Sequence, residues 1–203
     1  MRTSPSRADQ VMALAEDRGV LRPRDLQARG IPRVYLQDLY ERGLLQRLGR
    51  GVYAASDTDL SEHHSLAEVC AHAPRAAICL LSALRFHDLT TQNPRQVWVT
   101  LPLHAHRPRL DYPPLRLVYA SGAALTSGVE DHHIEGVLVR VYSPAKTVAD
   151  CFKYRSKVGL DVALDALRDC WRARRCTMED LWRYAEVCRV ANVMRPYLEA
   201  IAR

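Results

Sequence analysis

Glycine and proline divide residues 7–54 into short segments, and this punctuation constrains the fold of the chain more than any other feature. Between the breaks, apolar residues recur at spacings of three and four, which is the period of an amphipathic helix. Three helices are therefore predicted, over residues 7–18, 23–29 and 32–42. Pro23 and Pro32 suit a first helical turn, and a glycine follows each helix as a terminator.

Residues 44–48 and 52–54 alternate apolar and polar side chains in the manner of two strands. Gly49 and Gly51 flank Arg50 between them, and glycine permits the positive φ angles of a tight hairpin turn. Three helices followed by such a hairpin predict a winged helix-turn-helix, with Arg50 at the tip of the wing.

The third predicted helix has an apolar half and a polar half on a helical wheel. The apolar half, which is predicted to be core, holds Ile31, Tyr35, Leu36, Leu39 and Tyr40. In this motif the start of the third helix enters the DNA major groove, so Arg33, Val34 and Gln37 are predicted to reach base edges. Arginine suits guanine and glutamine suits adenine. Asp38 and Glu41 are expected to point along the groove or to pair with neighbouring arginines.

Positive charge is concentrated in the same stretch. Residues 18–54 hold eight arginines and three acids, which is a local excess of five positive charges. Arg22, Arg24, Arg47 and Arg50 therefore join the predicted DNA-binding residues, and binding is expected to weaken as salt rises. A protein-docking role stays open, because winged helices also serve as docking modules and a modest basic excess can be a solvated surface.

The chain has 203 residues with 48% hydrophobic content, which predicts a sizeable core and two domains. The expected division is residues 1–57 for the winged helix and 58–203 for the second domain. A net charge of +6 fits a nucleic-acid partner. The chain has no apolar run long enough to cross a bilayer and no apolar signal-peptide core near its start, which predicts a cytoplasmic protein without a membrane partner.

Residues 58–203 are predicted to mix a small sheet with a helical bundle, so the fold class is α+β. Helices are expected over residues 62–72, starting at a Ser61 cap, and over residues 76–87, a nearly continuous apolar run. Four strands are expected at 96–101, 115–120, 132–135 and 137–142, with the last two joined at Gly136. Four further helices are predicted, starting at Ser143-Pro144, near Leu160, at a Thr177 cap and near Val190, the last interrupted by Pro196.

Four blocks of the sequence resemble the AbiEi-type antitoxins of bacterial type IV toxin-antitoxin systems. They are RGLLQRLGRGVYA at 42–54, ICLLSALRFHDLTTQ at 78–92, RLDYPPLRL at 109–117 and SPAKTVADCFKYRSKVGLDVALDALRD at 143–169. The resemblance implies an N-terminal winged helix that binds inverted repeats in its own promoter. It also implies a C-terminal domain that counters a neighbouring nucleotidyltransferase-like toxin without a stable complex, and for some relatives a kinase-like action on the toxin.

The resemblance directs attention to Lys146, Thr147, Asp150 and Lys153, which share one helix at spacings of three and four. They either form a patch that contacts nucleic acid, toxin or nucleotide, or include an ordinary exposed pair of Lys146 with Asp150. A catalytic site is not predicted, because the sequence has neither a phosphate-binding GxxxxGK[ST] loop nor a nuclease ExK triplet. A protein that modifies the toxin remains the alternative, and the choice between monomer and dimer on DNA stays open.

Cysteine and histidine do not indicate a metal site. The six cysteines include no CxxC pair and are predicted to be buried thiols in a reducing compartment. The paired histidines at 63–64 and 132–133 lack further ligands at zinc spacing. We therefore predict no metal and no cofactor.

Overall fold

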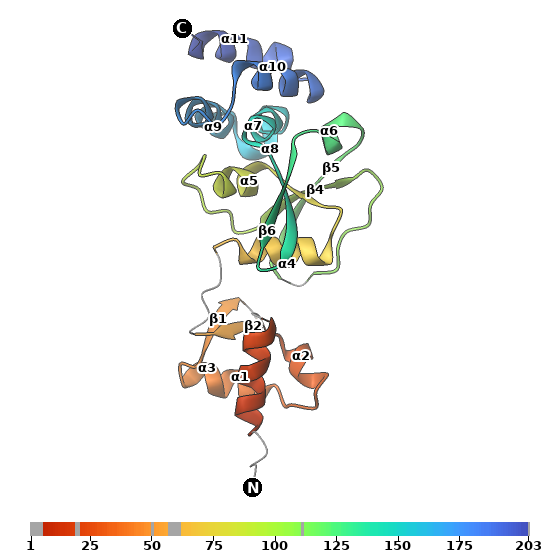
Figure 1. Cartoon of the computed structure of the whole chain (residues 1–203), viewed down its shortest axis with the longest axis vertical. Coiled ribbons are helices and arrows are strands. Elements are labelled where there is room, and N and C mark those ends of the chain that lie inside the picture. Colours follow the sequence, from red (N-terminus) through yellow and green to blue (C-terminus); the bar gives the residue numbers. More distant parts are fainter. Residues whose placement is uncertain (1–5, 19–20, 50, 57–61, 111, 203) are drawn as a thin grey trace. The chain divides into compact units, whose positions relative to one another are not determined.

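The computed structural model describes residues 6–18, 21–49, 51–56, 62–110 and 112–202. The chain divides into two compact units, Met1–Ser61 and Glu62–Arg203 (Figure 1). The predicted domain boundary after residue 57, the predicted helix cap Ser61 and the predicted wing tip Arg50 lie outside the described residues.

The N-terminal unit has three helices followed by a two-stranded antiparallel hairpin (Figure 1). These elements are α1 (Arg7–Arg18), α2 (Pro23–Gln27), α3 (Val34–Glu41), β1 (Leu45–Gly49) and β2 (Val52–Ala55). Their order agrees with the predicted winged helix-turn-helix. Helix α3 begins at Val34 rather than Pro32, because the backbone amides of Tyr35 and Leu36 bond three residues back, to Pro32 and Arg33, in a tighter turn.

The core of this unit is built from the predicted helix faces. It joins Val11 and Leu14 of α1, Leu26 of α2, and Leu36 and Leu39 of α3, all nearly inaccessible to water. Each such side chain contributes about 1.5–3 kcal/mol through burial. The three helices are therefore held by one shared apolar centre, and α3 is fixed by its inner face alone.

Two contacts of Tyr53, in strand β2, were not expected from the sequence. Leu21 forms an additional antiparallel bridge to Tyr53, with backbone hydrogen bonds of 2.7 and 3.0 Å, so the segment before α2 is tied to the wing. Tyr40, expected in the core, is 40% exposed and packs its ring edge-on against Tyr53 at 6.2 Å. A tyrosine at the margin of a helix face keeps its ring on apolar surface and its hydroxyl in water.

The second unit contains a five-stranded mixed sheet in the order β5-β4-β3-β7-β6. The strands are β3 (Ala77–Ile78), β4 (Val97–Pro102), β5 (Leu115–Ala120), β6 (Val129–Ile134) and β7 (Val137–Tyr142). Neighbours β3/β7 and β4/β5 are parallel, whereas β3/β4 and β6/β7 are antiparallel. The turn at Glu135-Gly136, with φ of 52° and 76°, joins β6 to β7 as a tight hairpin.

The predicted helix over residues 76–87 is wrong in its first turn. Its start forms β3, the central strand of the sheet, and helix α5 (Leu80–Phe86) follows directly. A central strand is buried on both faces, so it has the same continuous apolar sequence as a buried helix, and periodicity does not separate the two. The sheet therefore has five strands instead of the four expected.

Helices surround this sheet. Besides α5 they are α4 (His64–His72), α6 (Ala123–Thr126), α7 (Pro144–Lys153), α8 (Arg155–Val158), α9 (Leu160–Arg172), α10 (Met178–Val187) and α11 (Ala191–Ile201). Thr177 caps α10 as predicted, through a reciprocal pair of hydrogen bonds with Asp180. Helix α11 continues through Pro196, which was expected to interrupt it. The α+β fold class is confirmed.

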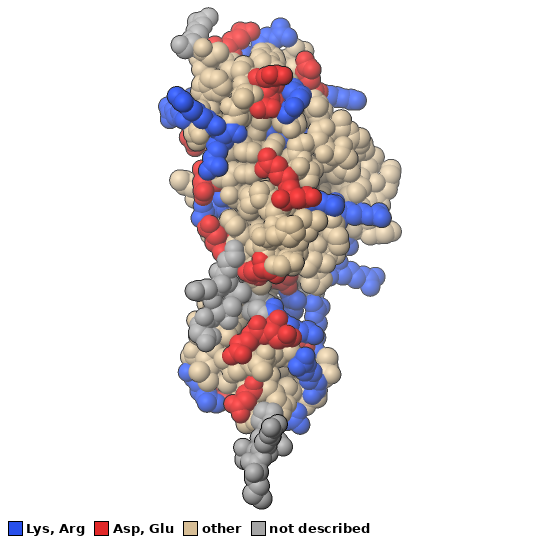
Figure 2. Space-filling view, viewed as in Figure 1, with Lys and Arg blue, Asp and Glu red and all other residues tan. Residues whose placement is uncertain are grey.

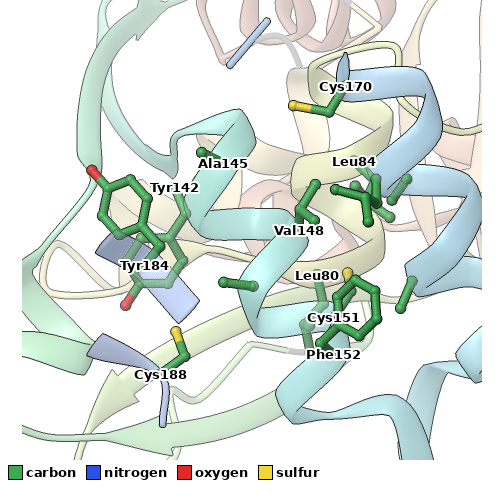
Figure 3. Packing of buried hydrophobic residues seen from close by; sticks show 14 of the residues in the cluster. Leu80, Leu84, Tyr142, Ala145, Val148, Cys151, Phe152, Cys170, Tyr184 and Cys188 are labelled. Atoms are coloured by element: carbon green, nitrogen blue, oxygen red, sulfur yellow. The ribbon is translucent and has the colours of Figure 1, made fainter. Parts of the chain in front are cut away.

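Helix α7 occupies the centre of the second unit. It contacts α5, α9, α10 and α11, and Figure 3 shows Val148, Cys151 and Phe152 of α7 beside Leu80 and Leu84 of α5. All five side chains are fully buried. Because helices cover it from several directions, α7 has little surface left for solvent.

Candidate nucleic-acid interface

The start of α3 presents polar and apolar side chains to solvent. Val34 is 62% exposed, and Arg33 and Gln37 are also exposed, whereas Leu36 and Leu39 on the opposite half are buried. An exposed valine next to an exposed arginine is not explained by packing within this unit. Helix α3 therefore divides into an inner and an outer face as predicted from the wheel, except at Tyr40.

The outer face of α3 contains two short side-chain interactions. The Gln37 amide nitrogen donates to a Glu41 carboxylate oxygen at 2.7 Å, and Arg42 pairs with Asp38 at 3.3 Å. Asp38 thus pairs with an arginine, as expected. Glu41 does not, because its carboxylate accepts the hydrogen bond from Gln37. Arg33 forms no ion pair with any residue in the described part of the chain, so its charge stays available. Gln37 must release Glu41 before its whole amide can bind a base.

Arg22 does not belong to the exposed set. Only 9% of its surface is accessible, and it precedes α2, where its backbone amide donates to Asp25 at 2.8 Å. The second oxygen of Asp25 accepts from Arg18 at 3.0 Å. The prediction of a DNA contact by Arg22 is therefore corrected, because this arginine lies inside the junction that starts α2.

The remaining predicted arginines of α2 and the wing are at the surface. Arg24 and Arg47 are exposed, and Arg50 lies outside the described residues. Arg29, which was not singled out from the sequence, is exposed after α2 and forms no ion pair among the residues described. Figure 2 shows arginines at both edges of the N-terminal unit and acidic side chains between them on the face turned to the viewer. The positive charge is thus distributed around α2, α3 and the wing.

The expected polar patch on the second unit is not a surface patch. Lys146 and Thr147 are 0% exposed and Asp150 is 4% exposed, while Lys153 is half-buried. The Lys146 ammonium lies 2.6 Å from an Asp150 oxygen and 4.0 Å from the centre of the Tyr142 ring. Both sequence interpretations, a contact patch and an exposed ion pair, are therefore wrong for Lys146, Thr147 and Asp150, because the packed helices around α7 exclude water from these three residues.

Hydrogen bonds complete the environment of this buried pair. The Thr147 hydroxyl donates to the Tyr142 carbonyl at 3.0 Å, and the Cys188 thiol donates to the second Asp150 oxygen at 3.2 Å. Burial, with the nearby Asp150 charge, raises the pKa of Cys188 to about 12, so this thiol stays protonated as a donor. Helix α7, the end of β7 and the end of α10 meet at this pair. Buried ionic groups whose hydrogen bonds are all formed favour a single packing of the elements that carry them.

Several histidine rings bond or pack against other groups of the second unit. The His87 ring nitrogen Nε2 bonds the Tyr142 carbonyl at 2.8 Å, and the rings of His63 and His132 lie 4.7 and 4.8 Å from Phe86. All six cysteines are free, and five are buried. Within the described ranges, no three His, Cys, Asp or Glu side chains are grouped as a metal ion would require. None of the helices in these ranges has the length and apolar character needed to span a bilayer.

Comparison with known proteins supports the N-terminal assignment. Residues 9–56 match the family model described as transcriptional regulator, AbiEi antitoxin, so the resemblance inferred from the sequence is confirmed over the N-terminal unit. No curated protein matches the chain. Among solved structures, the RV2827C protein from Mycobacterium tuberculosis is similar, with a TM-score of 0.53 and 19% identity over 92% of this chain and 73% of that one. This likeness shows a shared fold, and the family match supports a regulator role.

Proposed function

We propose that this protein is a DNA-binding antitoxin that represses its own promoter, with the start of α3 in the major groove of double-stranded DNA. The observation that carries the proposal is the simultaneous exposure of Arg33, Val34 and Gln37 on a helix whose other half is core. The family match over residues 9–56 supports the same role.

Each exposed side chain has a distinct partner in this proposal. Arg33 binds guanine through its two-pronged guanidinium, Gln37 binds adenine, and Val34 contacts the methyl group of thymine. Each well-formed base contact discriminates by about 1–3 kcal/mol. Val34, which is 62% exposed in the free protein, would then be covered by the thymine methyl group instead of by water.

Phosphate contacts are assigned to arginines around α3. Arg24 lies at the start of α2, Arg29 follows α2, and Arg47 lies on strand β1. Arg50, predicted at the wing tip, keeps its assignment. These contacts carry no sequence information but fix the orientation of the protein on the duplex. Each phosphate contact makes the slope of log affinity against log salt concentration more negative by about 0.9.

The second unit is assigned to counter a nucleotidyltransferase-like toxin encoded beside this gene, in the cytoplasm and without a stable complex. This part rests on the resemblance of the sequence blocks in residues 78–169. Because Lys146 and Asp150 are buried, they act by holding the fold of this unit and not by touching the toxin. A kinase-like action on the toxin is the alternative, and it too would need other residues.

The DNA proposal is tested by fluorescence anisotropy with a duplex from the region upstream of the gene and with a scrambled duplex. Arg33→Ala combined with Gln37→Ala is expected to weaken specific binding about tenfold or more and scrambled-duplex binding only by about twofold. Arg7→Ala, an equal charge loss at an exposed position of α1, is the control. Specific binding that survives the double substitution contradicts the assignment of α3.

The antitoxin proposal is tested by co-expression with the neighbouring toxin. The full chain is expected to restore growth, and purified toxin incubated with this protein and labelled ATP is expected to stay unlabelled. Rescue together with transfer of label to the toxin would favour the kinase-like alternative. Failure to restore growth would contradict the antitoxin role and leave the DNA assignment to be judged by its own test.

A further inference from the structure

A partly open groove of about 810 Å³ lies in the second unit, and Cys188, whose thiol donates to Asp150 of the buried pair at 3.2 Å, belongs to its lining. Four segments form it: the end of β4, the connection from β5 to α6, the junction of α7 with α8, and the connection from α10 to α11. Its volume is within the range of about 300–1,000 Å³ that is common for small-molecule sites.

Cations determine the charge of the groove. Lys153, Arg155 and Arg189 line it, and the described lining residues include neither Asp nor Glu. None of the three forms an ion pair with any described residue. Elsewhere in the same unit four arginines do form such pairs, namely Arg85, Arg140, Arg168 and Arg183. Arg155 donates one hydrogen bond to the Phe152 carbonyl at 3.0 Å, but the charges of all three side chains lack an ionic partner among the described residues. Guanidinium groups match phosphate oxygens well.

Aromatic rings lie beside these cations. Tyr119 is 41% exposed and Tyr154 is half-buried, and both line the groove together with Leu103, which is 52% exposed. The ammonium groups of Lys153 and Lys157 lie 5.7 and 5.4 Å from the centre of the Tyr154 ring, so this ring has cations beside it. Burial raises the pKa of Tyr154 to about 12, which keeps its hydroxyl neutral. Exposed rings in a concave site offer a stacking surface for a planar group.

We propose that this groove binds a nucleotide, with the phosphates against Lys153, Arg155 and Arg189 and the base against Tyr119 or Tyr154. Cations alone would serve inorganic phosphate and rings alone would serve an uncharged aromatic molecule. A nucleotide uses both in one site of this size. The proposal concerns binding only and is independent of the DNA contacts of α3.

Isothermal titration calorimetry of the full chain tests the proposal with ATP, GTP, CTP and UTP, and with adenosine and tripolyphosphate as its two halves. At least one nucleotide is expected to bind about tenfold or more tightly than tripolyphosphate, because stacking adds to phosphate binding. Tripolyphosphate that binds as tightly as every nucleotide would overturn the proposal, and so would no binding at all. A short oligoribonucleotide that binds more tightly than all four nucleotides would replace it with a strand-binding site.

Substitutions assign the binding to the groove. Lys153→Gln with Arg189→Gln is expected to weaken nucleotide binding about tenfold or more, since two charged phosphate contacts are lost. Arg195→Gln, an exposed position of α11 outside the groove, should change it less than about twofold, because exposed charges at a distance are screened by salt. Equal weakening by Arg195→Gln would show a general charge effect and overturn the assignment.

A ring substitution separates the base from the phosphates. Tyr119→Leu is expected to weaken nucleotide binding and to leave tripolyphosphate binding unchanged. Tyr119 is exposed, so the variant should fold, and tryptophan fluorescence of the second unit checks this. Unchanged nucleotide affinity in Tyr119→Leu and also in Tyr154→Leu would overturn the stacking assignment.

Discussion

Helices α3 and α7 carry polar side chains at the same spacing of four residues, but in opposite environments. On α3, Gln37 and Glu41 are exposed and lie 2.7 Å apart. On α7, Lys146 and Asp150 are buried and lie 2.6 Å apart. Spacing alone predicts that two side chains meet on a helix, and the surrounding elements decide whether water reaches them.

This difference determines what each pair does. An exposed pair contributes a few tenths of a kcal/mol, so a ligand can exchange it for its own contacts. A buried ionic pair gives little net stability by itself, but loss of one partner leaves an uncompensated charge in the core. Helix α3 is therefore suited to bind a partner, whereas α7 is suited to hold a fold.

The largest expected effect is at Lys146. Lys146→Met should lower the free energy of unfolding of the second unit by about 3–5 kcal/mol, because Asp150 is left buried and unpaired. Lys146→Met with Asp150→Leu should recover most of this loss. Urea unfolding followed by tryptophan fluorescence reports on this unit alone, since it holds Trp98, Trp171 and Trp182.

Lys153→Met, on the same helix but half-buried, is the control for this comparison and should change stability by less than about 1 kcal/mol. A similar small effect of Lys146→Met would show that the ion pair is not buried as described.

The close contact between Gly128 and α7 gives the next largest effect. A Cβ on Gly128 would lie 2.8 Å from the Lys146 Cβ and 2.9 Å from the Tyr184 ring, so Gly128→Ala should destabilise the unit by about 2–3 kcal/mol. Gly136 has a similar φ, 76° against 71°, with nothing within 4 Å, so Gly136→Ala carries the backbone strain alone. Equal losses of unfolding free energy in the two variants would show that the close contacts at Gly128 contribute nothing.

Stability of the second unit should also depend on pH through His87, next to the end of β7. Burial lowers the pKa of this imidazole below its usual 6.5. As pH falls through 6.5 the unfolded chain takes up the proton first, so the folded state loses stability until His87 itself is protonated. Urea midpoints at pH 7.5 and 5.5 should differ less in His87→Gln than in the natural chain. An equal difference would exclude His87 as the source.

The smallest expected effect is on α3. Glu41→Gln should raise affinity for the upstream duplex by about twofold, because a negative charge near the phosphates is removed and Gln37 is released for its base. Anisotropy titrations at two salt concentrations measure this change. A loss of affinity would mean that Glu41 positions Gln37 for the contact.

Local chemistry made part of the fold predictable. Gly19 predicted the end of α1, and the Thr177 cap predicted the start of α10. The centre of the sheet was not predictable, because Ala77 and Ile78 become a strand only through partners in β4 and β7. Those partners are distant in sequence, so the apolar run gives no sign of them.

The candidate site follows the same division. The outer face of α3 was predictable from the helical wheel, since the N-terminal unit has one core and α3 touches it on one side. The burial of Arg22 and of Lys146 depends on how neighbouring elements pack, which spacing does not encode. For the nucleotide groove, the only local signal was the run Lys153-Tyr154-Arg155, because its remaining wall comes from three other segments.

The most direct test of the central claim is a set of duplexes in which each base pair of the bound site is changed in turn. At the guanine bound by Arg33, the natural protein should lose about tenfold or more in affinity on substitution, whereas Arg33→Ala should be indifferent to that base pair. Arg47→Ala should weaken binding to all duplexes alike, since it touches phosphate. An Arg33→Ala protein that discriminates at every position as the natural protein does would contradict the account.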